Sequence, residues 1–299
     1  MQHALLLVNP KSRNGHSEEL DQATSLLKNA GIEVELCVTE RPSDMVSCIE
    51  NYKREDGVII VAGGDGTISA ALESVHKTQQ ALAILPMGTA NDLARSLGVP
   101  QDIVPAAQVI ANNKRERINL AKVNDHYFVN VAHIGLGVEV THELTSDMKK
   151  YFGVFAYLGA FISVIKRNKS FRVNIKADGC EESLRAIHLA VGNGRFYGGG
   201  NIVDEDSTLL DGQLNLFCLK PQRWWQLLLL GFNLRNGNLR VAERVVCKKA
   251  QKVSIKTSKR KQIHADGEHK TDTPADFVVI PEAIEVIVGD MPQPNKSKE

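Results

Sequence analysis

The feature that most constrains the fold of this chain is an apolar run, residues 58–62, followed directly by Gly63, Gly64, Asp65, Gly66 and Thr67. A short run of β-branched and small residues is typical of a buried strand. After the glycines, apolar residues recur at helical spacing, at Ile68, Ala71, Leu72 and Val75. A strand, a glycine-rich turn and a helix in this order bring backbone N–H groups and the positive end of a helix dipole close to an anion. The segment therefore predicts a phosphate-binding loop.

Asp65 needs its own explanation within this loop. No Gly-Lys-Ser/Thr follows, as a Walker motif requires, and Asp65 and Thr67 interrupt the glycine spacing of a dinucleotide-binding fingerprint. A carboxylate among phosphates is repulsive unless a divalent cation lies between them, so Asp65 is predicted to contact Mg²⁺ directly or through water. Taken alone, Asp65-Gly66 is more often a tight turn that binds no ligand.

A second loop of the same kind follows the next strand. Residues 82–85 are apolar and lead into Pro86-Met87-Gly88-Thr89-Ala90-Asn91-Asp92, after which a helix is predicted over 90–97. The carboxyl ends of neighbouring parallel strands line one crevice in an open sheet, and ligands bind there. The two loops are therefore expected to share one binding site.

The two halves of the chain differ in their predicted secondary structure. Strands predicted over 4–8, 32–39, 58–62 and 81–85 alternate with helices over 18–30, 43–54, 67–77 and 90–97. This alternation predicts an α/β domain with a parallel sheet. After about residue 115, strands with few helices between them predict an antiparallel β-sandwich, over 118–123, 127–134, 171–177, 184–191, 214–219, 253–257 and 284–288. We expect the domains to span residues 1–125 and 126–288.

The two loops, with sequences GGDGT and GTAND, resemble the catalytic domain of the diacylglycerol kinase-like lipid kinases, especially their soluble bacterial members. Phosphofructokinases and NAD kinases have similar GGDG loops, but the GTAND continuation is most similar to the lipid-kinase branch. The resemblance implies a first domain of the NAD kinase and phosphofructokinase type, completed by the end of the chain at residues 289–299. It also implies a β-sandwich domain that takes a lipid substrate.

The resemblance implies a set of residues that contact ATP, the phosphoryl donor. They are Asn9, Pro10, Lys11, Ser12, Arg13, Thr39, Gly63, Gly64, Asp65, Gly66, Thr67, Ile68, Ser69, Ala70, Gly88, Thr89 and Asn91. From the residues alone, the loop after the first strand is an ordinary turn, and Thr39 is only a β-favouring residue.

Two motifs of the second half carry candidate chemistry. In Leu209-Leu210-Asp211-Gly212-Gln213, the resemblance implies a Mg²⁺ held by the Asp211 carboxylate and the backbone carbonyls of Thr208 and Gln213. Without it, a hairpin turn is the simpler interpretation, and the acidic residues 204–206 depart from the family's Pro-x-Ala at this place. In Ala265-Asp266-Gly267-Glu268, both acidic residues match the family's active centre, with Glu268 as the expected proton acceptor and Asp266 sharing or supporting that role. Asp65 completes the predicted catalytic set.

Charge, cysteines and apolar runs bear on location and partners. A net charge of +1 gives no general attraction to nucleic acid. Five scattered cysteines without a pairing rhythm suit a reducing compartment, so a cytoplasmic protein is expected. A helix over the uncharged residues 151–165 would reach about 22 Å, short of the roughly 30 Å of a bilayer core. The aromatic and apolar run 224–232 and the basic residues after it, including the cluster at 256–261, suit transient contact with an anionic membrane or, equally, a core helix with a solvated basic face.

These observations predict an ATP- and Mg²⁺-dependent kinase that phosphorylates the hydroxyl of a lipid such as diacylglycerol. Two alternatives stay open at this point. A kinase of the NAD kinase type would share GGDGT but act on a soluble substrate. A catalytically silent lipid-binding protein would bind vesicles without transferring phosphate. A homo-oligomer is left open.

Overall fold

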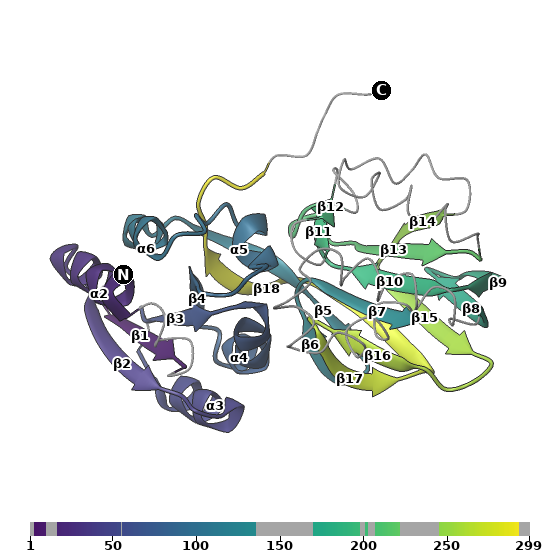
Figure 1. Ribbon diagram of the computed structural model, residues 1–299, viewed down its shortest axis with the longest axis horizontal. Coiled ribbons are helices and arrows are strands. Elements are labelled where there is room, and N and C mark those ends of the chain that lie inside the picture. Colours follow the sequence, from purple (N-terminus) through teal and green to yellow (C-terminus); the bar gives the residue numbers. More distant parts are fainter. Residues whose placement is uncertain are drawn as a thin grey trace, which may run out of the picture.

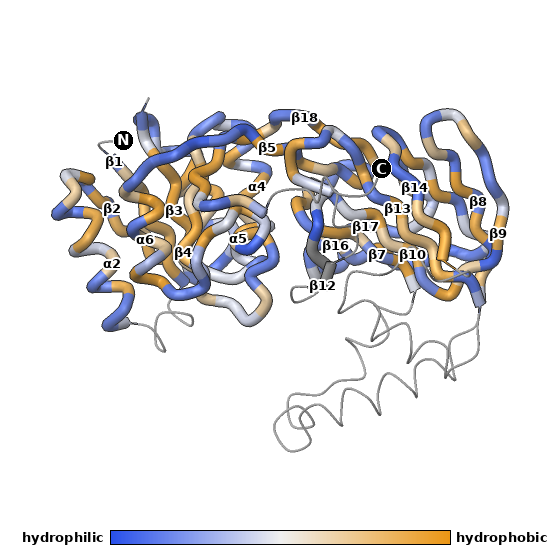
Figure 2. The backbone as a smooth tube through the Cα atoms, turned by 90° about the horizontal axis from the view of Figure 1, so that it is seen from above, coloured by the Kyte–Doolittle hydropathy of each residue, from blue (hydrophilic) through white to orange (hydrophobic). Residues whose placement is uncertain are grey.

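The computed structural model describes residues 3–9, 17–54, 56–135, 170–197, 201–202, 207–221 and 245–292 of the chain. Its first half is built on four parallel strands in the order β2-β1-β3-β4. Strands β3 (Val58–Gly63) and β4 (Ala81–Pro86) are buried at every position and β1 (His3–Val8) at all but the first, whereas β2 (Glu33–Val38) is an exposed edge. Strands covered on both faces are apolar throughout, which is why these segments lack alternation (Figure 2).

Helices cover both faces of this sheet (Figure 1). On one side α2 (Ser17–Asn29) packs beside α6 (Ile103–Asn112), and on the other α3 (Pro42–Asn51) packs beside α4 (Asp65–Thr78). A short helix, α5 (Asp92–Ser96), follows β4. Helix α6 is not among the helices predicted from the sequence. Its Pro105 lies in the first turn, where the missing N–H costs no helical hydrogen bond. The predicted α/β architecture is confirmed.

The second half is a sandwich of two mainly antiparallel sheets. The six-stranded sheet has the order β14 (Val245–Ala250), β13 (Leu214–Leu219), β10 (His188–Gly192), β7 (Val131–Gly135), β16 (Gln262–Ala265), β17 (Glu268–Asp272). Facing it are β5 (Arg115–Val123), β6 (His126–Phe128), β8 (Phe171–Ala177), β9 (Cys180–Ala186), β15 (Lys252–Thr257) and β18 (Ala275–Ile287), while β11 (Phe196–Tyr197) pairs with β12 (Asn201–Ile202). Alternate residues of β8 are buried, as expected for a strand with one face on a core. The predicted sandwich is confirmed.

Strand β18 joins the two halves into one ten-stranded sheet. It runs antiparallel to β5 and β15, and its end pairs in parallel with β4 through Val286 and Leu82. Beyond it, the Gly289 amide donates to the carbonyl of Leu97 at 2.9 Å. The chain has therefore returned to the first half by the end of β18, ahead of the segment 289–299, of which residues 293–299 lie outside the described part.

Two apolar segments that we predicted as single strands are each divided between the sheets. The segment 127–134 forms β6 and β7, and 184–191 forms parts of β9 and β10, with Ile187 between them. Both sheets of the sandwich bury apolar residues. The sequence is therefore apolar on both sides of the point where the chain passes from one sheet to the other. Residues Val129 and Asn130 consequently lie where the chain passes from one sheet to the other.

One disulfide departs from the expectation of unpaired cysteines. Cys37 of β2 and Cys48 of α3 are bonded across a separation of 11 residues, while Cys180, Cys218 and Cys247 are free. The crossover from β2 into α3 folds the chain back on itself, a proximity that cysteine spacing does not reveal. No helix in the described part of the chain is long and apolar enough to cross a membrane. The segment 151–165 lies outside the described residues.

Candidate active site

The two glycine loops touch each other at the carboxyl edge of the parallel sheet. Gly63 of β3 lies in register with Pro86 of β4, so the loops leave neighbouring strands side by side. A Cβ atom added to Gly88 would lie 2.6 Å from the Cα of Gly64, and one added to Gly64 would lie 3.0 Å from the Cα of Gly88. Only glycine permits this backbone approach. Gly66, Gly88 and Thr89 are exposed, so the joined loops leave backbone open to a ligand.

Asn91 braces the second loop. Its backbone adopts a left-handed conformation with φ of 49°, which asparagine tolerates better than most residues. Its Oδ1 accepts from the Gly88 amide at 2.9 Å, and its Nδ2 donates to the Gly88 carbonyl at 3.0 Å. The side chain thereby holds the backbone of its own loop, and its Nδ2 also donates to Oε1 of Gln101 at 3.2 Å.

Two further candidate residues follow the adjoining strands. Asn9 comes directly after β1, and Thr39 comes after β2, where its amide donates to the carbonyl of Val8 at 2.9 Å. Thr39 is buried, and its hydroxyl has no hydrogen-bond partner among the described residues. All four loops therefore begin at the same edge of the sheet. Pro10, Lys11, Ser12 and Arg13 lie outside the described residues.

Asp65, the first residue of α4, joins three parts of the chain. Its Oδ1 accepts from the amide of Leu93 in α5 at 3.2 Å and from Nδ2 of Asn130, between β6 and β7, at 3.3 Å. No described residue donates to Oδ2, which leaves that oxygen open. Asn130 is not among the residues suggested by the sequence, and neither is the buried Asp92, which stands in the GTAND motif itself.

Asp266 and Glu268 occupy the turn between β16 and β17. Asp266 and Gly267 have positive φ values of 48° and 86°, as the hairpin turn favoured by Asp-Gly requires. Asp266 is buried, and its carboxylate accepts from the backbone amides of Val129 and Asn130 at 3.0 Å and of Val131 at 3.2 Å. Burial raises the pKa of Asp266 to about 6, although these amides pull it down. Glu268, by contrast, has a side chain 54% exposed and an ion pair with Lys270 at 2.8 Å.

The predicted metal motif forms a compact turn. Oδ1 of Asp211 accepts from the Gln213 amide at 3.0 Å, and Oδ2 accepts from the Thr208 amide at 3.3 Å. The backbone amides of both residues thus face the Asp211 carboxylate. Carboxylate and carbonyl oxygens are the ligands that suit a hard cation such as Mg²⁺. Lys249 approaches the same carboxylate to 3.9 Å. No group of three His, Cys, Asp or Glu side chains suited to a metal occurs among the described residues, so a cation here would rely on backbone oxygens and water.

Four histidines form a row across neighbouring strands of the six-stranded sheet. Ring centroids are 6.2 Å apart from His188 to His133, 5.9 Å from His133 to His264 and 5.6 Å from His264 to His269. Burial, with repulsion from His264, lowers the pKa of His133 from 6.5 to about 4. Burial, with repulsion from His133, lowers the pKa of His188 to about 3. Both rings are therefore neutral at neutral pH.

The histidine row predicts acid instability. An unfolded histidine binds a proton below pH 6.5 and the buried ones do not, so stability is full above pH 6.5 and falls as the pH drops towards their lowered pKa values. In that window each such histidine costs about 1.4 kcal/mol per pH unit. We expect His188→Gln to flatten the pH dependence of the free energy of unfolding, measured with urea between pH 7 and 5. The exposed His126→Gln should leave it unchanged, and equal slopes for wild type and His188→Gln would refute this origin.

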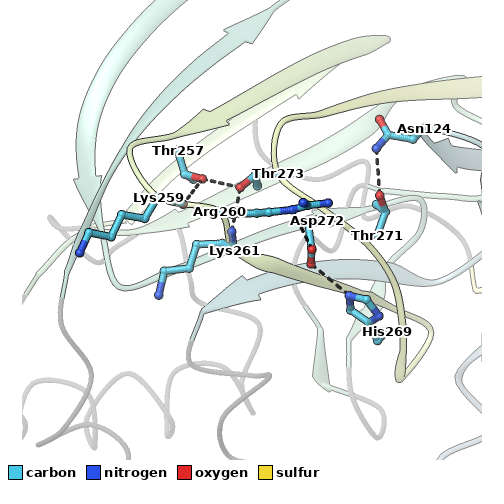
Figure 3. A network of polar contacts seen from close by, with 9 residues as sticks. All are labelled: Asn124, Thr257, Lys259, Arg260, Lys261, His269, Thr271, Asp272 and Thr273. Carbon is cyan, nitrogen blue, oxygen red and sulfur yellow. Dashed lines mark hydrogen bonds and ion pairs between the residues drawn. The ribbon is translucent and has the colours of Figure 1, made fainter.

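A polar network holds the basic turn between β15 and β16 (Figure 3). The hydroxyls of Thr257 and Thr273 are in contact, and Oγ1 of Thr273 accepts from the Lys261 amide at 3.0 Å. Arg260 pairs with Asp272 at 3.0 Å. Lys256 and Lys259 are exposed and pair with no described carboxylate. The turn therefore presents net positive charge from a fixed backbone. The apolar run 224–232 lies outside the described residues.

Comparison with known proteins agrees with this geometry. Residues 3–123 match the diacylglycerol kinase catalytic domain, and residues 131–288 match the YegS C-terminal NAD kinase beta sandwich-like domain. The chain belongs to the diacylglycerol kinase-like family of lipid kinases. A diacylglycerol kinase of Bacillus subtilis is 29% identical over 293 residues, covering 96% of this chain and 97% of that protein. One from Staphylococcus aureus is 28% identical over 287 residues, covering 95% and 91%. A crystal structure of a diacylglycerol kinase from Bacillus anthracis superimposes with a TM-score of 0.81 at 27% identity, covering 97% and 98% of the two chains.

Proposed function

We propose that this lipid kinase uses ATP and Mg²⁺ to phosphorylate a hydroxyl of a lipid such as diacylglycerol. The observation that carries the proposal is the backbone contact between Gly64 and Gly88, which joins two glycine loops into one surface at the carboxyl edge of the sheet. Backbone amides at the start of α4 and in the exposed second loop suit phosphate groups. Positioning and charge neutralisation supply most of the catalysis in phosphoryl transfer, and such a surface serves both.

ATP would lie across the loops that follow the four parallel strands. Its phosphates would meet the loops 63–70 and 88–91, and its remaining groups would reach Thr39 and the loop 9–13. The buried, unpartnered hydroxyl of Thr39 supports a polar contact with the nucleotide. Asp65 would bind Mg²⁺ directly or through water with its open Oδ2, and the metal would neutralise charge on the transferred phosphoryl group.

A second Mg²⁺ would be held by Asp211 and the carbonyls of Thr208 and Gln213. Oxygen ligands of this kind suit the ion, and few protein ligands leave room for water. The Asn119 amide donates to the Leu209 carbonyl at 2.8 Å, which fixes the turn to β5. A cation there would order the loop without touching substrate.

The sandwich, residues 126–288, would bind the lipid, and Glu268 would accept the proton of its hydroxyl. Of the two acidic residues in the β16–β17 turn, Glu268 alone has a side chain that substrate can reach, because the carboxylate of Asp266 is buried and occupied by three amides. A general base must lie within hydrogen-bond reach of the proton it takes.

The protein would meet its substrate by transient contact with an anionic membrane through the basic turn Lys256–Lys261. Each cation near such a surface contributes on the order of 1 kcal/mol, so several give weak, reversible binding. The polar network in Figure 3 holds the backbone of this turn in place.

Reversing two charges of this turn should weaken membrane binding. We expect the double variant Lys256→Glu and Lys259→Glu to bind vesicles containing phosphatidylglycerol more than about tenfold more weakly in sedimentation, since two attractive charges become repulsive. A matched control reverses Lys28 and Lys53, which are exposed on the first domain. Equal binding by both double variants would place the membrane contact elsewhere.

The acceptor is tested by offering several hydroxyls to the pure protein. Labelled ATP and Mg²⁺ are incubated with mixed micelles of diacylglycerol, phosphatidylglycerol, ceramide or a sphingoid base, and separately with NAD. The proposal predicts label in a lipid and none in NAD. Transfer to NAD alone would favour the soluble-substrate kinase, and vesicle binding without transfer would favour a silent lipid-binding protein.

A further inference from the structure

A three-residue segment, Val129–Val131, lies between the two candidate carboxylates. Its backbone amides donate to the carboxylate of Asp266, as described above. Its carbonyls are occupied too, because the Asn130 oxygen accepts from the Asn193 amide at 2.9 Å and the Val131 oxygen accepts from the Asp266 amide at 2.9 Å. The Val129 oxygen accepts from the side chain of Asn193, so every peptide group of the segment has a partner, which fixes its backbone.

Asn193 holds this segment from the other side. It is fully buried, and its Nδ2 donates to the Val129 carbonyl at 3.1 Å and to the Asn119 carbonyl at 2.9 Å. Asn119 in turn contacts Leu209, ahead of the proposed metal turn, through its backbone amide. Buried side-chain amides with several bonds are rigid connectors, because breaking any bond leaves a polar group unsatisfied.

The fixed segment directs one side chain into the nucleotide domain. Asn130 is buried, and its Nδ2 lies 3.3 Å from Oδ1 of Asp65. Together with the Leu93 amide, it gives Oδ1 one donor from each half of the molecule. Two donors on one oxygen fix the rotation of the carboxylate, and no described residue donates to its other oxygen, Oδ2.

We propose that Asn130 is a positioning residue for phosphoryl transfer, orienting the Asp65 carboxylate, and that Asp266 acts through Asn130 by fixing its backbone. This rests on the proposed function and deepens it, because it separates the two acidic residues of the β16–β17 turn. Asp266 fixes the backbone of the segment that positions the Asn130 side chain. Glu268 is the acidic residue of this turn that contacts the substrate. The sandwich thus contributes to the orientation of a group in the nucleotide domain.

The first test compares kcat and amide hydrogen exchange in two variants. Asn130→Ala removes the donor to Asp65 and keeps the amides that bind Asp266, so kcat should fall about ten- to a hundredfold while exchange at Val129–Val131 stays slow. Asp266→Asn should lower kcat and also speed exchange at these amides. The exposed Asn174→Ala of β8 serves as control and should change neither.

A second variant and a double-mutant cycle test whether Asn130 acts on catalysis through Asp65. Asn130→Asp keeps the side-chain size but sets a carboxylate against Asp65, so kcat should fall further than in Asn130→Ala. In an Asp65→Asn background, Asn130→Ala should have little further effect on MgATP affinity or kcat, because no carboxylate remains to be oriented. Full kcat in Asn130→Ala, or additive losses in the cycle, would overturn the inference. If the wild type transfers no phosphate, the proposed function fails instead, and the exchange data still report whether Asp266 fixes the segment.

Discussion

Replacing Asp65 by asparagine is expected to lower kcat about a thousandfold, near the upper range for removing one group that stabilises transition-state charge. Asparagine has the same shape, and its Oδ1 can still accept from Leu93 and Asn130, so the fold should be retained. What is lost is the negative charge that would hold Mg²⁺ beside the phosphates. Steady-state transfer of labelled phosphate to lipid gives kcat, and thermal unfolding without ligand gives stability.

A control on the same helix separates a local effect from a general one. Glu73 of α4 is exposed, and Glu73→Gln changes the same charge away from the loop. It should leave both kcat and the melting temperature close to wild type. Full activity in Asp65→Asn would show that the Asp65 carboxylate is not needed for phosphoryl transfer. The loop would then act through its backbone amides alone.

Replacing Glu268 by glutamine is expected to lower kcat about a hundredfold, the lower range for loss of a general base. The lower range applies because phosphoryl transfer depends mainly on positioning and charge neutralisation, with less demand on proton removal. The KM for ATP should change little, since Glu268 is not among the residues proposed to contact ATP. Measuring kcat at saturating ATP and lipid separates the two parameters.

The matched control for Glu268 is a glutamate in a comparable ion pair of the same domain. Glu182 pairs with Lys248 at 2.6 Å, and Glu182→Gln should leave kcat unchanged. If both variants keep wild-type kcat, the proton acceptor is another group. If both variants lose activity equally, the loss in Glu268→Gln comes from a general loss of stability and not from removal of a base.

Features set by local sequence were predictable in this chain, and features set by distant contacts were not. The loops after β3 and β4 could be read from apolar runs, glycines and helical spacing, because each is complete within about a dozen residues. Asn130 was missed because its partner Asp65 lies 65 residues away and is reached through a crossing between sheets. The Cys37–Cys48 pair, separated by only 11 residues, was missed for a different reason. The crossover from β2 into α3 brings the two cysteines together, and their spacing in the sequence does not indicate it.

The different environments of the Asp266 and Glu268 side chains could likewise not be predicted from the sequence. Both stand in one turn, two residues apart, and carry the same charge. The hairpin turns one side chain inward to the amides of the segment Val129–Val131 and leaves the other at the surface. The residues that make up that inward site come from a strand crossing more than a hundred positions earlier, and no local pattern indicates them.

The most direct test of the account is a calorimetric titration of the pure protein with ATP in the presence of Mg²⁺. We expect saturable binding that weakens strongly without Mg²⁺ and in Gly88→Ala, because an added Cβ would meet the Cα of Gly64 at 2.6 Å and separate the two loops. No binding by the wild type with Mg²⁺ present, or unchanged binding by Gly88→Ala, would contradict the claim that these loops together hold a magnesium-bound nucleotide.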